Sequence, residues 1–139
     1  MQGDNSNLAD VEKMSESTGE FFELINTIPV PVIMLAEGAA MAGGLGMLCA
    51  ADIVVVTKDC KFALTETTLG IVPAQIAPYI VSRVGLSKAR RLMLTASRFT
   101  GKEAFDYGIA DFVAEGSDEL MKIESEVKKD ILRLSLIHI

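Results

Sequence analysis

The spacing of apolar residues changes along the chain from the period of a helix to that of a strand. Apolar side chains recur every three or four positions over residues 11–27, which predicts an amphipathic helix that ends before Pro29. Short apolar runs at residues 32–36 and 53–57 predict buried strands, and the second run consists of β-branched residues. Residues 43–50 lie between them, carry no charge and predict an apolar helix.

Short strands and helices continue to alternate in the second half of the chain. The expected elements are a strand at residues 61–64, a helix at 73–84 despite Pro78, a helix capped by Ser87 that ends at 94 or 95, a helix that opens at Thr100, a strand at 111–113 and a helix capped by Ser117 that runs to about 131. Thr100 and Glu103 have the spacing of a capping box, and Gly85 and Gly108 stand where helices would end. This alternation predicts an α/β fold.

Composition limits the class of protein. The 139 residues suit one domain, and half of them are hydrophobic, which is enough for a sizeable core. The formal net charge of −6 argues against a nucleic-acid partner. A polyanion such as coenzyme A would have to be held by local donors, because the overall charge repels it.

Cysteine usage and hydropathy bear on the compartment. Cys49 and Cys60 have no C-x-x-C spacing, and the N-terminus lacks the basic and apolar regions of a signal peptide. The long apolar stretch at residues 38–56 contains Asp52 and ends in β-branched residues, so a helix followed by a strand fits it better than a membrane span. We therefore expect a reduced, cytoplasmic protein with no membrane partner.

The most informative segment joins a glycine-rich turn to the apolar helix. The first amides of a helix have no partner within it, so Gly43 and Gly44 could offer N–H groups to a developing negative charge. This is the geometry of an oxyanion hole. The structural alternative is that these glycines allow tight helix packing, and this role suits Gly44 better than Gly43.

Four sequence blocks in register resemble the crotonase superfamily of enoyl-CoA hydratases and isomerases. They are Glu-Gly-Ala-Ala-Met-Ala-Gly-Gly at residues 37–44, Ala-Asp-Ile-Val-Val at 51–55, Phe-Ala-Leu-Thr-Glu-Thr-Thr-Leu-Gly-Ile-Val-Pro at 62–73, and the segment from Leu94 to Val113. The match spans residues 29–113. It implies part of a crotonase-like ββα spiral, truncated at both ends.

The resemblance implies an upstream half with an Ala-Gly-Gly-Asp type loop, which supplies the family's second oxyanion N–H. Only residues 2–8 could be a remnant of it. At the other end, residues 132–139 resemble a translated sequencing adapter and include the sole histidine, His138. We expect residues 1–131 to be part of a single crotonase-like domain and residues 132–139 to be a non-native tail. We also expect the isolated chain to aggregate or oligomerise and to lack measurable hydratase activity.

The resemblance assigns two catalytic candidates. Gly43 matches the family's helix-end oxyanion donor, with Ala42 and Gly44 beside it as candidate substrate contacts. Glu66 matches the second of two glutamates in crotonase-type hydratases. The residues themselves support this assignment, because Glu66 lies in an apolar stretch that should desolvate its carboxylate. The alternative is an exposed loop glutamate.

Gly46 stands where the family has its first glutamate, which leaves the reaction open. Some one-glutamate members are Δ3-Δ2 enoyl-CoA isomerases, whereas methylglutaconyl-CoA hydratases of leucine degradation and isohexenylglutaconyl-CoA hydratases also have glycine there. Pro-Ala-x-Ile-x-Pro-Tyr at residues 73–79 resembles these hydratases, which favours hydration of a branched glutaconyl-CoA. Gln75 and Tyr79 are candidates to line the acyl pocket, although such residues more often pack on a helix surface. We expect Gly46→Glu to alter water addition and leave binding nearly intact.

The remaining expectations concern partners and cofactors. The resemblance implies an acyl-CoA thioester as substrate, a homotrimer or hexamer in full length, and no separate cofactor, because coenzyme A arrives with the substrate. Nothing in the sequence has metal-ligand spacing. A noncatalytic CoA-binding or scaffold subunit is the alternative to an enzyme. Lys88, Arg90 and Arg91 could meet CoA phosphates, but a solvated helix face is the commoner role for such a cluster.

Overall fold

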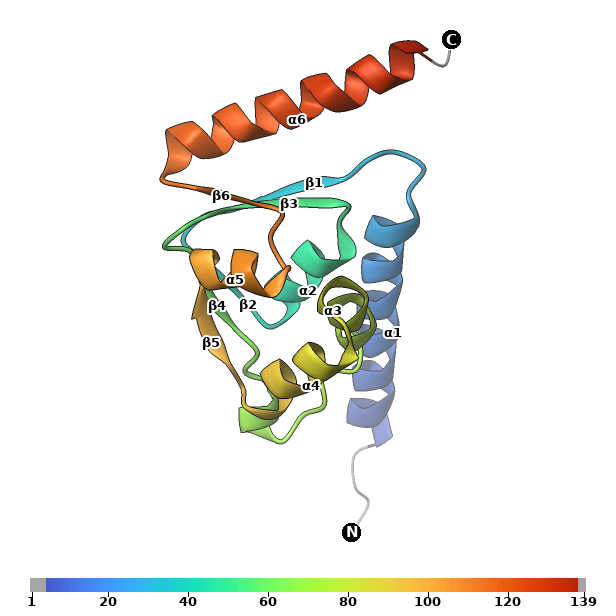
Figure 1. Ribbon diagram of the computed structural model, residues 1–139. Coiled ribbons are helices and arrows are strands. Elements are labelled where there is room, and N and C mark those ends of the chain that lie inside the picture. Colours follow the sequence, from blue (N-terminus) through green and yellow to red (C-terminus); the bar gives the residue numbers. More distant parts are fainter. Residues whose placement is uncertain (1–4, 138–139) are drawn as a thin grey trace.

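Helices surround two small β-sheets in the computed structural model, which describes residues 5–137 (Figure 1). The elements are, in order, α1 (Asn5–Thr27), β1 (Ile33–Ala36), β2 (Ala39–Met41), α2 (Gly43–Ala50), β3 (Ile53–Thr57), β4 (Lys61–Ala63), the 3-10 turn η1 (Glu66–Leu69), α3 (Ala77–Val84), α4 (Leu86–Leu94), β5 (Arg98–Thr100), α5 (Gly101–Tyr107), β6 (Phe112–Ala114) and α6 (Ser117–Ile137). The predicted mixed α/β composition is therefore confirmed.

The two sheets have different topologies. The first has the order β1-β3-β6 and is parallel throughout, with Ile33 opposite Ile53 and Val55 opposite Phe112. In the second, β4 pairs with β2 in parallel and with β5 antiparallel. Helix α6 lies across one face of the first sheet, while α2 and α5 lie on its other side (Figure 1). Covering both faces is what a parallel sheet requires.

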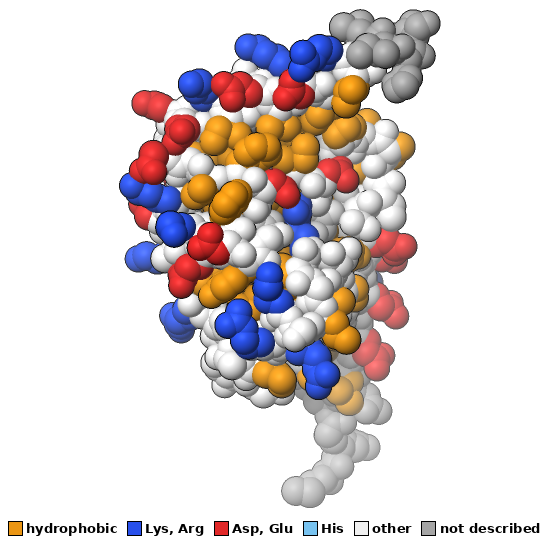
Figure 2. All heavy atoms as spheres, in the orientation of Figure 1, with side chains coloured by type: hydrophobic (Ala, Val, Ile, Leu, Met, Phe, Trp, Pro, Cys, Tyr) orange, Lys and Arg blue, Asp and Glu red, His pale blue; other side chains and the backbone are white. Residues whose placement is uncertain are grey.

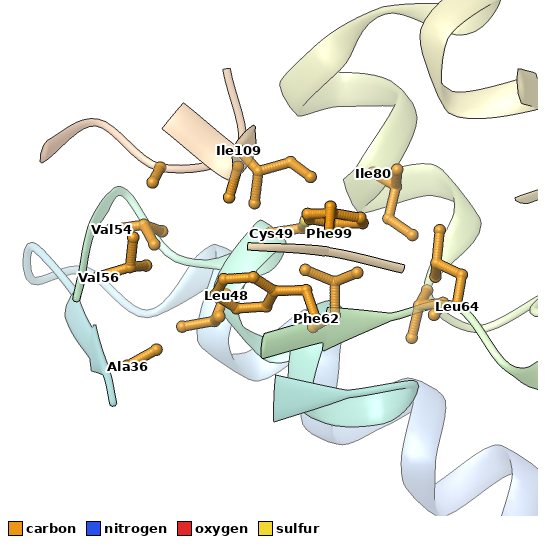
Figure 3. Close-up of a cluster of buried hydrophobic side chains, with 14 of the residues drawn as sticks. Ala36, Leu48, Cys49, Val54, Val56, Phe62, Leu64, Ile80, Phe99 and Ile109 are labelled. Carbon is orange, nitrogen blue, oxygen red and sulfur yellow. The ribbon is translucent and has the colours of Figure 1, made fainter. Parts of the chain in front are cut away.

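The side chains of β3 alternate between two apolar clusters, as the period of a strand dictates. Val54 and Val56 enter the main core, where they join Leu48 of α2 and Ile109 (Figure 3). Val55 points to the opposite face and packs with Leu120 of α6 in a second, smaller cluster. Both clusters exclude water from β3, since all three of these valines have no exposed surface.

Hydrogen bonds fix the C-terminal end of α2 against its neighbours. Arg83 of α3 donates from Nη2 to the carbonyl oxygen of Ala51 at 3.0 Å, and its Nη1 forms an ion pair with Asp111 Oδ2 at 3.2 Å. The same carboxylate oxygen accepts the Val54 N–H at 2.8 Å. These contacts hold α2, β3 and α3 together, so the position of α2 is set from its far end.

The predicted bounds of α2 and β3 are confirmed, but α1 differs from its prediction. It begins at Asn5 and not at residue 11. Its apolar side chains were expected to face a core, yet most of them are exposed, and only Phe22 is buried. The exposed ones are Leu8, Val11, Met14, Phe21 and Leu24, and Ile28, which follows the helix, is exposed as well.

Three later helix starts also differ from the sequence prediction. Helix α3 begins at Ala77, which leaves Pro78 in the first turn, where its missing N–H costs no helical hydrogen bond. Helix α4 begins at Leu86 after Gly85, so Ser87 lies inside the helix and does not cap it. Ser117 is the first residue of α6 and donates its hydroxyl proton to the Glu37 carboxylate.

The chain ends are only partly described. Residues 1–4 and His138 with Ile139 lie outside the described residues, and Asn5 to Leu8 form the first turns of α1. Helix α6 continues to Ile137, past the predicted end near residue 131. That residues 132–139 are a non-native tail stays a prediction. None of the described helices combines the length and hydropathy needed to cross a membrane.

Both cysteines are free and buried. Burial raises the pKa of the Cys49 thiol to about 12, a shift partly offset by the positive charge of Arg83. Burial also raises the pKa of Cys60 to about 11. A thiol that stays protonated at neutral pH is a poor nucleophile, so both residues act as core side chains.

Candidate active site

A cavity of about 230 Å³ lies where α1 meets the start of α2, η1 and the segment that leads into α3. Its lining residues are Thr18, Phe22, Gly43, Glu66 and the segment of residues 71–76. The cavity therefore brings together Gly43, Glu66 and Gln75 from the set of candidates. Sequence reasoning missed Thr18 and Phe22, because the spacing of apolar residues on α1 gave no sign of which face meets the other elements.

Gly43 is placed by the sharp turn from β2 into α2. Ala42 has φ 47° and ψ −115°, an unusual conformation for alanine, and its N–H donates to the Ala63 carbonyl oxygen at 2.9 Å. The Ala42 carbonyl then accepts the Gly46 N–H at 3.1 Å, which starts the helix. Among the described residues, nothing accepts the Gly43 N–H. This amide lies at a helix N-terminus beside the cavity and is free to bind an anionic oxygen.

Glu66 opens the turn η1 on another wall of the cavity. The turn is closed by a hydrogen bond from the Ile71 N–H to the Glu66 carbonyl at 3.0 Å, and it is tied to α4 by the Thr67 hydroxyl, which donates to the Met93 carbonyl at 3.0 Å. The Glu66 side chain is half-buried, and its Oε2 atom is buried without a hydrogen-bond partner in the described part of the chain. The structure thus differs from the alternative of a fully exposed loop glutamate.

The two acyl-pocket candidates occupy different positions. Gln75 lines the cavity, and its Nε2 donates to Ser15 of α1, both to the carbonyl oxygen at 3.2 Å and to the hydroxyl. This side chain therefore ties the cavity's rim to α1. Tyr79 lies outside the lining residues and packs its ring against Phe22, with 5.9 Å between the ring centroids.

Gly44 and Ala42, the chain neighbours of Gly43, do not line the cavity that holds Glu66. Gly44 faces a different hollow of about 330 Å³ between β1, β2 and α2, where methionines such as Met34 and Met47 line the wall. Ala42 makes the turn described above and lies outside both sets of lining residues.

Gly46 has no room for a side chain. A Cβ atom there would lie 2.2 Å from Cγ2 of Ile76, far inside the contact distance of real atoms. That Gly46→Glu leaves binding nearly intact stays a prediction, although the new side chain would first have to displace Ile76. Ile76 belongs to the motif at residues 73–79, but the sequence gives no sign that this side chain contacts Gly46.

The basic cluster lies on α4, and none of its three residues lines the cavity. The Lys88 ammonium donates to the Tyr107 carbonyl oxygen at 2.9 Å, and the Arg91 guanidinium carbon lies 5.4 Å from the centroid of the Tyr107 ring. Arg90 is exposed. Lys88 and Arg91 thus contact α5, which fits the alternative of a helix face with structural contacts.

A buried carboxylate oxygen and a free helix-end amide on one cavity agree with the order of the sequence motifs, and comparison with known proteins identifies the family. The family model described as enoyl-CoA hydratase/isomerase matches residues 1–139. The chain belongs to this family. Among solved structures, AtuE of Pseudomonas aeruginosa is 39% identical with a TM-score of 0.85 over 86% of this chain and 46% of its own. The predicted crotonase-like fold is thereby confirmed.

Curated relatives agree at similar identity. A probable enoyl-CoA hydratase of Bacillus subtilis is 32% identical over 81% of this chain and 44% of its own length. The mitochondrial methylglutaconyl-CoA hydratase of Homo sapiens is 34% identical over 82% of this chain and 36% of its own length. The chain thus spans less than half the length of these relatives.

Proposed function

We propose that Glu66 is the acid/base and the Gly43 amide the oxyanion donor of a hydratase that acts on a branched, glutaconyl-type enoyl-CoA thioester. One observation carries the proposal: Glu66, whose Oε2 atom is buried without a partner among the described residues, and Gly43, at the start of α2, line the same cavity. A buried carboxylate oxygen without a protein partner calls for an explanation, and a role in acid/base catalysis is one that fits it.

The proposed reaction uses one carboxylate twice. As the oxygen of water bonds to C3 of the enoyl group, Glu66 takes the proton that water releases, and the electrons of the double bond move through C2 to the thioester oxygen. The Gly43 N–H donates to that oxygen as it becomes negative, and one such donor is typically worth about 2.7–4 kcal/mol. Glu66 then returns the proton to C2, so that its carboxylate is regenerated.

The lining of the cavity suits the hydrocarbon part of an acyl group, while the second carboxylate of a glutaconyl group finds no cationic partner among the described lining residues. Most of the lining residues are apolar, and Gln75 adds one carboxamide; the apolar ones are Phe22, Ile71, Val72, Pro73, Ala74 and Ile76. Apolar walls with few polar groups are typical of sites that bind small acyl chains. The name of the human relative, a methylglutaconyl-CoA hydratase, supports the choice of a branched glutaconyl thioester.

A Δ3-Δ2 enoyl-CoA isomerase is the second candidate, and a specific observation favours it. Among the described lining residues, Glu66 is the one carboxylate. An isomerase needs a single base, which takes a proton from C2 and returns it at C4. A noncatalytic CoA-binding or scaffold subunit is the third candidate, and the placement of Glu66 beside a free amide counts against it.

Assembly and compartment belong to the same proposal. A homotrimer or hexamer in a full-length protein and a cytoplasmic location rest on the resemblance to crotonases and on the composition. Oxygens of the CoA phosphates would need local donors, because the net charge of the chain is −6.

The test replaces Glu66 by glutamine, which keeps the size of the side chain and removes its basicity. The substrate is methylglutaconyl-CoA, and the assay uses the 139-residue chain together with any longer protein that its reading frame encodes. In whichever of these proteins converts the substrate, we expect Glu66→Gln to bind the thioester normally. Its kcat should fall about 100- to 10,000-fold, the usual effect of removing a general acid or base.

The matched control is Glu20→Gln, which changes an exposed carboxylate of α1 outside the cavity lining. It should leave kcat unchanged. Mass spectrometry of the product separates the reactions, because hydration adds one water and isomerisation adds no mass. Near-normal turnover by Glu66→Gln would refute the acid/base assignment, and a product of unchanged mass would favour the isomerase.

A further inference from the structure

Gly46 lies in the middle of α2 at a point of unusually close approach. A Cβ atom built on it would lie 2.2 Å from Cγ2 and 2.8 Å from Cβ of Ile76, and 3.3 Å from Cε1 of Phe22. Real Cβ atoms essentially never come within 3.0 Å of another heavy atom, so one of the partners must move if residue 46 gains a side chain. Gly44, only two residues earlier, would bring its Cβ to an ordinary 3.6 Å from Ala40.

The two side chains that face Gly46 are also walls of the cavity that holds Glu66. Ile76 and Phe22 both line it, and both are 3% exposed. A side chain at position 46 would therefore emerge between two lining residues and point toward the cavity, were Ile76 not already there. Gly46 itself is buried behind them and does not line the cavity.

The backbone holds Ile76 firmly in this place. Its N–H donates to the Pro73 carbonyl oxygen at 3.2 Å, and its own carbonyl oxygen accepts the Ile80 N–H at 3.1 Å as α3 begins. Rotation about χ1 could move Cγ2 away, but Cβ of Ile76 would stay 2.8 Å from a Cβ at position 46 unless this backbone shifted. A side chain at position 46 has to compete with a fixed neighbour.

We propose that Ile76 determines how many carboxylates the cavity can hold, because it fills the volume that a side chain at position 46 would occupy. Positions 46 and 76 form a reciprocal pair, and one of the two must be glycine. With Ile76 present, the apolar side chain takes the place of a second acid/base group and leaves Glu66 alone. The catalytic meaning of the pair rests on the proposed function of Glu66, but its steric basis does not.

The first test is a double-mutant cycle, made in the 139-residue chain or, where that chain aggregates, in any longer protein that its reading frame encodes, and read as the urea midpoint of unfolding. Gly46→Ala should shift the folded-to-unfolded ratio at least roughly tenfold toward the unfolded state, as overpacking of a core does. Gly44→Ala is the matched control in the same helix and should shift it much less. In the Ile76→Gly background, the penalty of Gly46→Ala should disappear, because both clashing atoms are gone.

The second test asks whether an opened position 46 faces Glu66. In Gly46→Glu/Ile76→Gly, glutamates with a 13C-labelled carboxyl carbon are titrated by NMR, and the two carboxylates should titrate as a coupled pair. In Gly44→Glu, whose side chain faces the other hollow, the new carboxylate should titrate independently of Glu66.

Equal penalties for Gly46→Ala and Gly44→Ala, a penalty that Ile76→Gly does not remove, or independent titration in the double variant would overturn the proposal. None of these readouts requires thioester turnover. Failure of the Glu66→Gln prediction would therefore leave them unaffected, so the two proposals can fail separately.

Discussion

Two of the helices within residues 5–137 begin with a glycine, and the two glycines have different physical roles. Helix α2 begins at Gly43 after a turn with positive φ at Ala42, and no side chain caps it. Helix α5 begins at Gly101 after Thr100, whose side chain forms a complete capping box with Glu103. In α2 no side chain caps the amides beside the cavity, whereas in α5 the Glu103 N–H donates to the Thr100 hydroxyl and the Lys102 N–H donates to the Lys58 carbonyl oxygen.

Gly43 and Gly101 also differ in the space available for a side chain. A Cβ at Gly101 would lie 1.9 Å from the Thr57 carbonyl oxygen, so glycine lets α5 pack directly on the end of β3. A Cβ at Gly43 would meet Phe22 at an ordinary 3.9 Å. Glycine is thus required for packing at position 101, whereas packing alone would accept alanine at position 43. The difference directs attention to the amide of Gly43 as the reason for an open helix start.

The largest expected effect tests whether packing requires glycine at position 101 but not at position 43. Gly101→Ala drives a methyl group into backbone, which cannot move as a flexible side chain would, and should lower the free energy of unfolding by about 3 kcal/mol or more. Gly43→Ala should change it by less than ~0.5 kcal/mol, as tolerated substitutions do. Urea denaturation of both variants measures the contrast. Equal losses would mean that Gly43 is also a packing glycine.

A smaller effect concerns the turn that aims the Gly43 amide. Ala42 has φ 47° and is one of two described non-glycine residues with positive φ, the other being Ala96 with φ 46°. Glycine adopts such angles without a clash, so Ala42→Gly should raise the free energy of unfolding by about 1 kcal/mol, after the added entropy of the unfolded chain is counted. Ala96→Gly provides the comparison outside the cavity. A thermal midpoint that falls in Ala42→Gly would show that the turn stores no strain.

Sequence reasoning predicted those elements whose signals are local. The bounds of α2 and β3 follow from an uncharged apolar run and a β-branched run, and the capping box of α5 from the spacing of Thr100 and Glu103. The expected end of α3 at Gly85 also holds. In each case, neighbours in the chain determine the structure, so their spacing is enough.

The sequence-based predictions fail where contacts between residues far apart in the chain determine the structure. The spacing of apolar residues on α1 could not show that Phe22 alone would be buried while Leu24 and Ile28 face outward. A band of hydrophobic side chains is also visible on the surface beneath α6 (Figure 2). Motif order placed Gly43 and Glu66 as candidates, and the structure brings both to one cavity. The contact of Gly46 with Ile76 spans two elements and has no signal in either.

The smallest expected effect is a pH-dependent contribution to stability from Glu103 in the capping box of α5. Hydrogen bonds from the Thr100 N–H at 2.8 Å and from the Thr100 hydroxyl at 3.0 Å lower the pKa of Glu103 below its ordinary value of 4.5. A carboxylate with a lowered pKa in the folded state stabilises the fold above its unfolded pKa, and this contribution is lost as the pH falls through the folded value.

Glu103→Gln isolates this contribution, because glutamine can still accept the Thr100 N–H in a capping box but does not titrate. The thermal midpoint of the wild type should therefore exceed that of Glu103→Gln slightly at pH 7, and the difference should shrink once the pH is taken below 4.5. Helix α2 has no acidic residue in its first turn, so its open start should show no such dependence. A difference that persists unchanged in acid would mean that the carboxylate charge adds nothing to the cap of α5, and that the two helix starts differ in geometry alone.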